Sequence, residues 1–159
     1  MNLEKIVERL TEEKMTISSM ESCTGGCFCN SLTNVEGASL VFKFSAITYS
    51  NEYKIKFGVK KSTIDKYSVY SFEVADEMSY NISKYADSDI GIGITGKLNR
   101  ADVNNMFGED NVVFISVYDK GKDKDKFYHK RVVATLDNRV SNKELVVKEV
   151  SLILEKILV

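Results

Sequence analysis

The sequence predicts an α/β fold, a three-layer α/β/α sandwich around a mixed, mainly parallel sheet of about five strands. Helical and strand-like segments alternate along the first half of the chain, as they do in proteins built from βαβ units. A hairpin pattern follows at 112–134, and antiparallel strands added to a parallel core make a mixed sheet. The 159 residues suit a single domain, 1–159, with a core of ordinary size.

The first part of the chain alternates between amphipathic and strand-like segments. Residues 2–13 carry apolar side chains at positions i, i+3, i+4 and i+7, which predicts a helix. The apolar run 15–20 predicts a strand, and a helix is expected to follow to about residue 32. The second half of 40–50 is β-branched and aromatic, which predicts another strand, and 55–70 is expected to form short helical pieces.

The sequence from residue 71 onward predicts the remaining helices and strands. Ser71 is a plausible N-cap for an amphipathic helix. Isoleucines alternate with small residues over 89–96, which predicts a strand whose glycines let a helix lie close to one face. Residues 97–111 are polar and aperiodic and are expected to form a long loop. The last predicted elements are hairpin strands at 112–118 and 127–134 and a closing helix at 138–159.

Composition excludes several classes of function. The net charge of −1 gives no reason to expect a nucleic-acid partner or an acidic membrane surface. No apolar run approaches the roughly 20 residues that a membrane-spanning helix needs, and the amphipathic N-terminus is unlike a signal peptide, so a cytoplasmic protein is expected. Three cysteines, Cys23, Cys27 and Cys29, crowd into one segment, where we expect buried, reduced thiols and neither a disulfide framework nor a metal site.

The segment 21–26, Glu-Ser-Cys-Thr-Gly-Gly, joins a predicted strand to a predicted helix. Such a joint holds the hydroxyl of Ser22 at the carboxyl edge of the strand, next to main-chain N–H groups that can bind an anion. The two glycines allow a ligand or another backbone to approach closely. The segment therefore suggests a nucleophile site, although an ordinary turn with a Ser or Thr N-cap has the same letters.

A serine nucleophile needs a base, and two residue types are available. The sole imidazole, His129, falls in the middle of a predicted hairpin strand, which makes a Ser-His-Asp triad improbable. A lysine acts as a base once burial or a neighbouring cation lowers its pKa. Lys54 directly follows a predicted strand end and is within reach of Ser22 if the two strands are neighbours, with Tyr49 placed to relay or orient the proton. The alternative for Lys54 is an ordinary surface lysine.

The glycines within 91–96 match the dinucleotide-binding spacing G-x-G-x-x-G by letters alone. They lie inside a predicted strand, and a polar loop follows where that motif requires a helix. No cofactor is therefore expected.

Several segments together resemble the CinA C-terminal-domain family. The resemblance spans nearly the whole chain. It is carried by Glu-Ser-Cys-Thr-Gly-Gly at 21–26, Gly-Ala-Ser at 37–39, Tyr-Ser-Asn-Glu-Tyr-Lys at 49–54, Ser-Phe-Glu-Val-Ala at 71–75, Thr95-Gly96 and Asp-Asn-Arg at 137–139.

The resemblance implies an α/β/α homodimer that hydrolyses the amide of nicotinamide mononucleotide to nicotinic acid mononucleotide and ammonia. It also implies a serine nucleophile at Ser22 and a lysine base at Lys54, with Tyr49 beside them and no metal. Main-chain N–H groups near 24–26 are expected to stabilise the oxyanion. The substrate-binding residues expected on this basis are Thr24, Gly25, Gly26, Asn51, Thr95, Gly96 and Arg139.

One segment departs from the family pattern. After Thr-Gly the family continues with Ile-Ala-Gly-Pro and a further glycine-rich turn, whereas this chain has Lys97-Leu98-Asn99-Arg100-Ala101-Asp102. Lys97 or Arg100 then offers a cation for a phosphate. The family's second arginine, near the start of the last helix, is matched only by Lys143, which loses bidentate geometry. The alternative function is therefore a catalytically impaired relative that binds a nucleotide or a protein.

Overall fold

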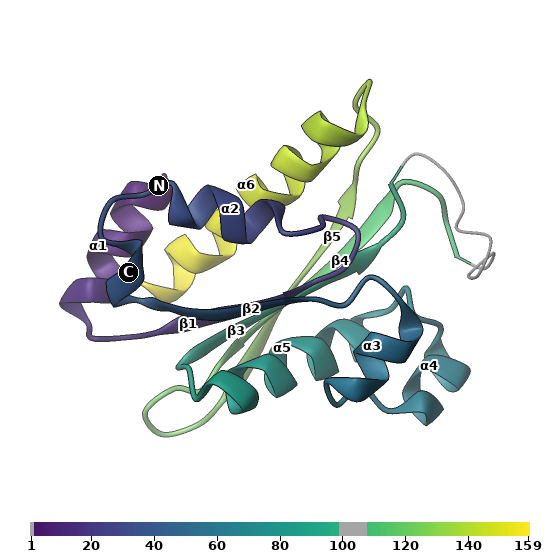
Figure 1. Ribbon diagram of the computed structural model, residues 1–159, viewed down its shortest axis with the longest axis horizontal. Helices are drawn as coiled ribbons and strands as arrows, with labels where there is room; N and C mark the ends of the chain where they lie inside the picture. Colours follow the sequence, from purple (N-terminus) through teal and green to yellow (C-terminus); the bar gives the residue numbers. More distant parts are fainter. Residues whose placement is uncertain (1, 99–107) are drawn as a thin grey trace.

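Five strands form one mixed sheet in the order β2-β1-β3-β4-β5 (Figure 1). The computed structural model describes residues 2–98 and 108–159. β1, β2 and β3 run parallel, β4 is antiparallel to β3, and β5 is antiparallel to β4. Four of the five strands thus share one direction. The strands are β1 Ile17–Glu21, β2 Phe42–Ile47, β3 Ile90–Gly96, β4 Val112–Asp119 and β5 Lys126–Val133.

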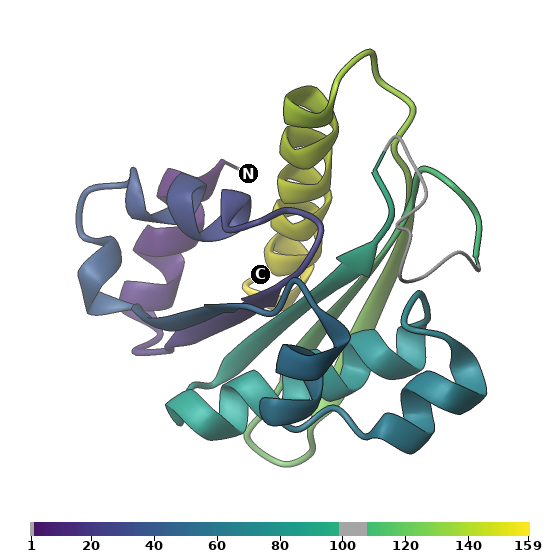
Figure 2. The same ribbon diagram turned by 45° about the vertical axis from the view of Figure 1, so that its right-hand side comes forward.

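Helices cover both faces of this sheet (Figures 1 and 2). On one face lie α1 Leu3–Glu12, α2 Cys27–Thr33 and α6 Arg139–Ile157, and on the other lie α3 Asn51–Lys56, α4 Lys61–Tyr67 and α5 Phe72–Ala86. A short 3₁₀ helix, η1 Ala38–Leu40, precedes β2. The predicted α/β/α fold with a mixed five-stranded sheet is confirmed. Among the helices of the described residues, none has the length and apolar character to span a membrane.

The sheet separates two apolar clusters. The larger cluster lies under α1, α2 and α6 and takes its strand side chains from alternate positions such as Ile90, Ile92 and Ile94. The smaller one lies under α5 and includes Met20 and Val74. Because side chains alternate across a strand, residues of one parity share one face of the sheet. Ser22 follows Met20 by two positions and therefore belongs to the α5 side.

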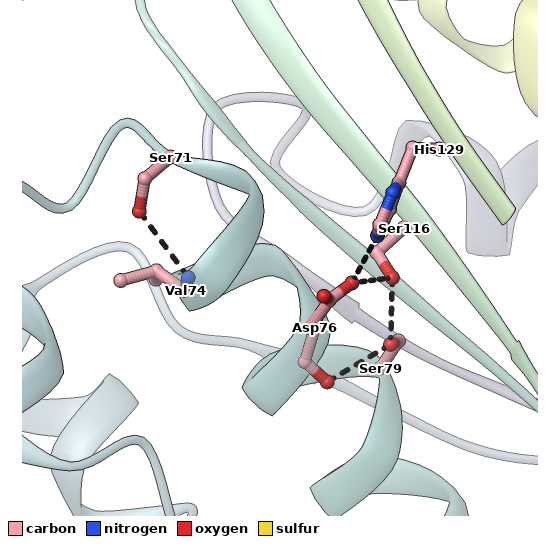
Figure 3. Close-up of polar contacts among 6 residues, drawn as sticks. All are labelled: Ser71, Val74, Asp76, Ser79, Ser116 and His129. Carbon is pink, nitrogen blue, oxygen red and sulfur yellow. Dashed lines mark hydrogen bonds and ion pairs between the residues drawn. The ribbon is translucent and has the colours of Figure 1, made fainter. Parts of the chain in front are cut away.

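Side-chain caps fix where the helices begin. Ser71 Oγ accepts a hydrogen bond from the Val74 amide at the start of α5 (Figure 3), as its predicted role as an N-cap requires. Ser50 caps α3 in the same way, by accepting from the Tyr53 amide. This second cap starts the helix at Asn51, four residues before the helical pieces expected from 55 onward. Lys54 therefore lies on a helix.

The chain reverses its winding around β1. From β1 it passes through α2 to β2, and it returns through α3, α4 and α5 to β3, which pairs with β1 on its other side. Helices α2 and α5 lie on opposite faces of the sheet (Figure 1). The carboxyl ends of β1 and β3 thus form a topological switch point, where open α/β sheets commonly bind ligands. The segment 21–26 begins at this point.

The predicted loop 97–111 is described only at its ends. Lys97 continues alongside β4 by donating its amide to the Val112 carbonyl, and the described chain resumes at Gly108. Arg100 lies outside the described residues.

Helix α5 contacts β3 closely because β3 lacks side chains at two positions. A Cβ on Gly91 would stand 2.0 Å from the Ser79 carbonyl oxygen, which belongs to the helix backbone. We expect Gly91→Ala to lower the free energy of unfolding by about 3 kcal/mol, because the helix must move away from the sheet. Denaturant unfolding followed by circular dichroism measures this loss.

Gly37→Ala provides the comparison. Nothing lies within 4 Å of a Cβ at Gly37, but its φ of +84° disfavours alanine, so a cost of about 1 kcal/mol is expected. Equal costs at Gly91 and Gly37 would contradict the close helix–sheet contact.

Candidate active site

Ser22 and Lys54 meet at the carboxyl end of β1. Ser22 is the residue after the strand, Lys54 lies in α3, and 2.9 Å separates Lys54 Nζ from Ser22 Oγ. Only 2% of Lys54 and 7% of Ser22 is exposed, so Lys54 is not a surface lysine. Lysine is rarely buried to this extent without a specific partner. The structure thus brings together the predicted nucleophile and the predicted base.

Thr48 holds the amino group of Lys54 from the other side. Its carbonyl oxygen accepts a hydrogen bond from Lys54 Nζ at 2.8 Å, and its amide donates to the Glu21 carbonyl at 2.8 Å. The chain between β2 and α3 is therefore fastened to the end of β1. The Thr48 hydroxyl is buried and has no hydrogen-bond partner among the described residues. The sequence assigns Thr48 no role, because its contact with Lys54 uses the main chain.

The turn at 22–26 presents main-chain N–H groups beside Ser22. Gly25 and Gly26 have φ angles of +58° and +93°, which side chains disfavour, and the Gly25 amide donates to the Ser22 carbonyl. Within the described residues, the amides of Thr24 and Gly26 donate to no other group. Two N–H groups in the turn that begins at Ser22 therefore remain available to an anion.

Glu21 supports this turn with a fully buried carboxylate. It accepts hydrogen bonds from the Thr24 hydroxyl at 2.7 Å and from the amides of Phe28 and Cys29 at 3.0 Å each. These amides belong to the first turn of α2, so Glu21 fixes the helix relative to Ser22. The sequence predicts no role for the Glu21 carboxylate, although a single charge at the end of an otherwise uncharged strand is a visible signal.

Removing the Glu21 carboxylate should destabilise the domain. Glu21→Ala leaves two buried donors and one partly buried donor without an acceptor, and we expect the free energy of unfolding to fall by about 3 kcal/mol or more. Glu21→Gln keeps one acceptor oxygen and should lose less. Denaturant unfolding measures both variants, with Glu52→Ala as the control because Glu52 is an exposed partner of Lys56. An Ala variant as stable as this control would contradict the supporting role.

The three cysteines do not supply the nucleophile. Burial raises the pKa of the Cys23 thiol to about 12, despite the opposing charge of Lys54, so this thiol is protonated at neutral pH. Burial also raises the pKa of Cys27 and of Cys29. All three are free thiols, but the expectation that all three are buried holds for Cys23 alone, because Cys27 and Cys29 are partly exposed. Among residues 22 and 23, only the serine hydroxyl contacts a base.

Cations at the start of α6 lie over the turn. Arg139, the first residue of the helix, donates from Nη1 to the Leu98 carbonyl just beyond β3. Lys143, one helical turn later, places Nζ 3.5 Å from the position that a Cβ would occupy on Gly25. The positive charge of Arg139 also acts on Cys23, which places it near the Ser22 turn. The site therefore carries two cations that an anionic ligand can approach.

The other residues predicted to bind substrate differ in accessibility. The Thr95 hydroxyl is fully buried and donates to the Val69 carbonyl. Gly96 lies against β4, since a Cβ there would stand 2.5 Å from the Val112 carbonyl oxygen. Tyr49 follows β2 with 63% of its surface exposed, and no described residue forms a hydrogen bond with its side chain. Asn51 is the first residue of α3 and partly buried.

The only imidazole belongs to a separate polar cluster. His129 Nε2 lies 2.6 Å from Asp76 Oδ1, which also accepts a hydrogen bond from the Ser116 hydroxyl (Figure 3). The carboxylate thus lies between His129 and Ser116, which is not the order of a Ser-His-Asp triad. Neither Ser22 nor Lys54 takes part in this cluster. Among the described residues, no group of three or more His, Cys, Asp and Glu side chains is placed to hold a metal ion.

Comparison with known proteins identifies the family. The CinA C-terminal domain family matches residues 2–157. The chain belongs to this family. A competence-damage inducible protein from Clostridium kluyveri is 41% identical over 126 residues, which are 78% of this chain and 30% of the relative. A CinA-like protein from Kosmotoga olearia is 48% identical over 97 residues, 60% of this chain and 24% of that protein. This CinA domain therefore spans less than a third of the length of these relatives.

Solved structures of the CinA superfamily share the fold. The protein from Klebsiella pneumoniae 700603 superposes with a TM-score of 0.86 at 20% sequence identity, covering 99% of this chain and 98% of that one. The Escherichia coli protein gives a TM-score of 0.79 at 23% identity, covering 92% and 84%. These TM-scores establish a shared fold. At 20% and 23% sequence identity, the similarity does not establish the chemistry of the site.

Proposed function

We propose that this CinA domain deamidates nicotinamide mononucleotide to nicotinic acid mononucleotide and ammonia, with Ser22 as nucleophile and Lys54 as base. The observation that carries the proposal is the buried contact of 2.9 Å between Lys54 Nζ and Ser22 Oγ. A lysine within hydrogen-bond distance of a serine hydroxyl is the arrangement of a Ser–Lys nucleophile pair. Membership of the CinA C-terminal domain family supports this choice of substrate.

The Thr48 carbonyl orients the base. A neutral amine has two N–H groups and one lone pair, and a carbonyl oxygen can only accept a hydrogen bond. With one N–H directed to the Thr48 carbonyl, the lone pair of Lys54 can face the Ser22 hydroxyl and accept its proton. Burial favours the uncharged form of an amine, which is the form that a base requires.

The reaction proceeds by acyl transfer. Lys54 accepts the proton from Ser22 Oγ as this oxygen attacks the carboxamide carbon. The amides of Thr24 and Gly26 stabilise the resulting oxyanion, and one such donor is typically worth about 3 kcal/mol. Lys54 then returns the proton to the amide nitrogen, which leaves as ammonia. Water, deprotonated by Lys54, cleaves the ester on Ser22 and releases the carboxylate product.

Positive residues at the start of α6 support an anionic substrate. Arg139 and Lys143 add positive charge near the Ser22 turn, which favours an anionic nucleotide over a neutral amide. Asn51, at the joint between β2 and α3, is our candidate for a ribose hydroxyl.

Product analysis tests this function. Purified protein is incubated with nicotinamide mononucleotide, and ammonia and nicotinic acid mononucleotide are measured together, with Lys54→Met as the inactive control. Equal amounts of both products, absent in the control, are expected. Nucleotide binding without either product would favour the impaired, ligand-binding relative and overturn the proposed catalysis.

A further inference from the structure

Lys97 is a buried lysine whose contacts with the described residues are long. Its side chain is 1% exposed. Among the described residues, its ammonium contacts the Gly108 carbonyl at 3.4 Å and the Asp110 carboxylate at 3.9 Å, and it lies 5.1 Å from the centre of the Tyr70 ring. A buried ammonium costs several kcal/mol unless close partners satisfy it. These contacts are long for hydrogen bonds, so Lys97 retains capacity to bind an anion.

The strand register places Lys97 beyond Ser22 on the same face of the sheet. The Ser22 amide donates to the Ile94 carbonyl, so Ser22 lies level with the end of β3. Glu21 pairs with Ile94, so Ser22 is level with Thr95, and Lys97 is two residues further, roughly 7 Å along the strand direction. The parity of the strand puts Thr95 and Lys97 on the α5 side, where they contact Val69 and Tyr70. A nucleotide whose carboxamide is at Ser22 can extend in this direction.

We propose that Lys97 binds the phosphate of the nucleotide substrate and that Asp110 occupies its ammonium when substrate is absent. The inference rests on the proposed function and assigns a phosphate-specificity residue to the same site. Asp110 is 60% exposed and lies beyond hydrogen-bond distance, so an anion arriving from solvent can displace it. A phosphate dianion offers more charge and more acceptor oxygens than a single carboxylate, which favours the exchange.

The competing explanation is that Lys97 only fills space against the Tyr70 ring. The two explanations predict opposite effects on stability. Lys97→Met removes a poorly paired buried charge and keeps the volume, so the melting temperature without ligand should stay equal or rise. A lysine that served packing and its cation–π contact alone would lose stability on this substitution.

Inorganic phosphate is the first probe, because it reports the anion site without catalysis. Millimolar phosphate should raise the melting temperature of the wild-type protein and of a Lys61→Met control, whose lysine is exposed and paired with Asp65. The rise should disappear in Lys97→Met and increase in Asp110→Asn. Equal phosphate stabilisation of wild type and Lys97→Met would overturn the assignment.

Kinetics with nicotinamide mononucleotide provide the second readout. Lys97→Met should raise KM by about tenfold to a hundredfold with kcat nearly unchanged, and Asp110→Asn should lower KM by about twofold to fivefold. An unchanged KM in Lys97→Met, with wild-type turnover intact, would overturn the phosphate role and leave the amidohydrolase standing. Absence of turnover in the wild type would instead count against the proposed function, while the phosphate measurement still decides whether Lys97 binds the anion.

Discussion

The Ser22→Ala variant is expected to lose turnover of nicotinamide mononucleotide by at least about a thousandfold while keeping its fold. The substitution removes the hydroxyl that lies 2.9 Å from Lys54 Nζ and exchanges it for a side chain that occupies less space. Oxyanion donors and substrate contacts stay in place, so nucleotide affinity should change little. Initial rates of ammonia release and the binding constant, measured on the same preparation, check both parts.

Cys23→Ala is the matched control for this variant. Residue 23 is adjacent, similarly buried and chemically a stronger nucleophile when ionised, but burial raises the pKa of its thiol to about 12. Its replacement should therefore leave the rate within a few-fold of wild type. If Cys23→Ala were inactive and Ser22→Ala active, the nucleophile would be the thiol.

The second large effect is expected at Lys54. Lys54→Met should reduce turnover as strongly as Ser22→Ala, because no other described side chain can take the Ser22 proton. Lys54→Arg should not restore activity, since a guanidinium stays protonated and cannot act as a base. A lysine needed only for its positive charge would be replaced by arginine with partial activity. Comparing kcat of the two variants separates the roles.

The double variant Ser22→Ala/Lys54→Met tests whether the two residues act as a unit. Catalytic groups that depend on one another give losses that do not add, so the double variant should be no slower than either single variant. A fold-loss in kcat of the double variant equal to the product of the two single fold-losses would indicate that Ser22 and Lys54 contribute independently. Circular dichroism and melting temperature of all three proteins establish that the fold is retained.

The fold could be predicted because its signals are local. The alternation of isoleucine with small residues at 89–96 corresponds to β3, and the cap at Ser71 corresponds to the start of α5. The start of α3 was harder to place, because Ser50 is one hydroxyl among many and its cap is a single hydrogen bond of 3.3 Å. A helix start that depends on one weak hydrogen bond is difficult to predict from the sequence.

The site was predictable to the extent that its residues follow strand ends. Ser22 and Lys54 come just after consecutive parallel strands, and that position alone suggested their contact. The residues that hold Ser22 and Lys54 in place could not be predicted in this way, because their partners are main-chain groups or lie in distant segments. Glu21 binds amides seven and eight residues further on, and Arg139 binds the Leu98 carbonyl across 41 positions. These partners are main-chain amides and a carbonyl, which every residue type carries, so no sequence pattern marks them.

The hydrogen bond from Lys54 to the Thr48 carbonyl also bears on how this domain can change over evolutionary time. A main-chain oxygen is present whatever side chain occupies position 48, so random substitution there does not remove the acceptor that orients the base. Position 54 has no such freedom, because only lysine supplies an amine of this reach. Variation among descendants of this sequence should therefore be permissive at 48 and severely restricted at 54, although the two residues contact each other.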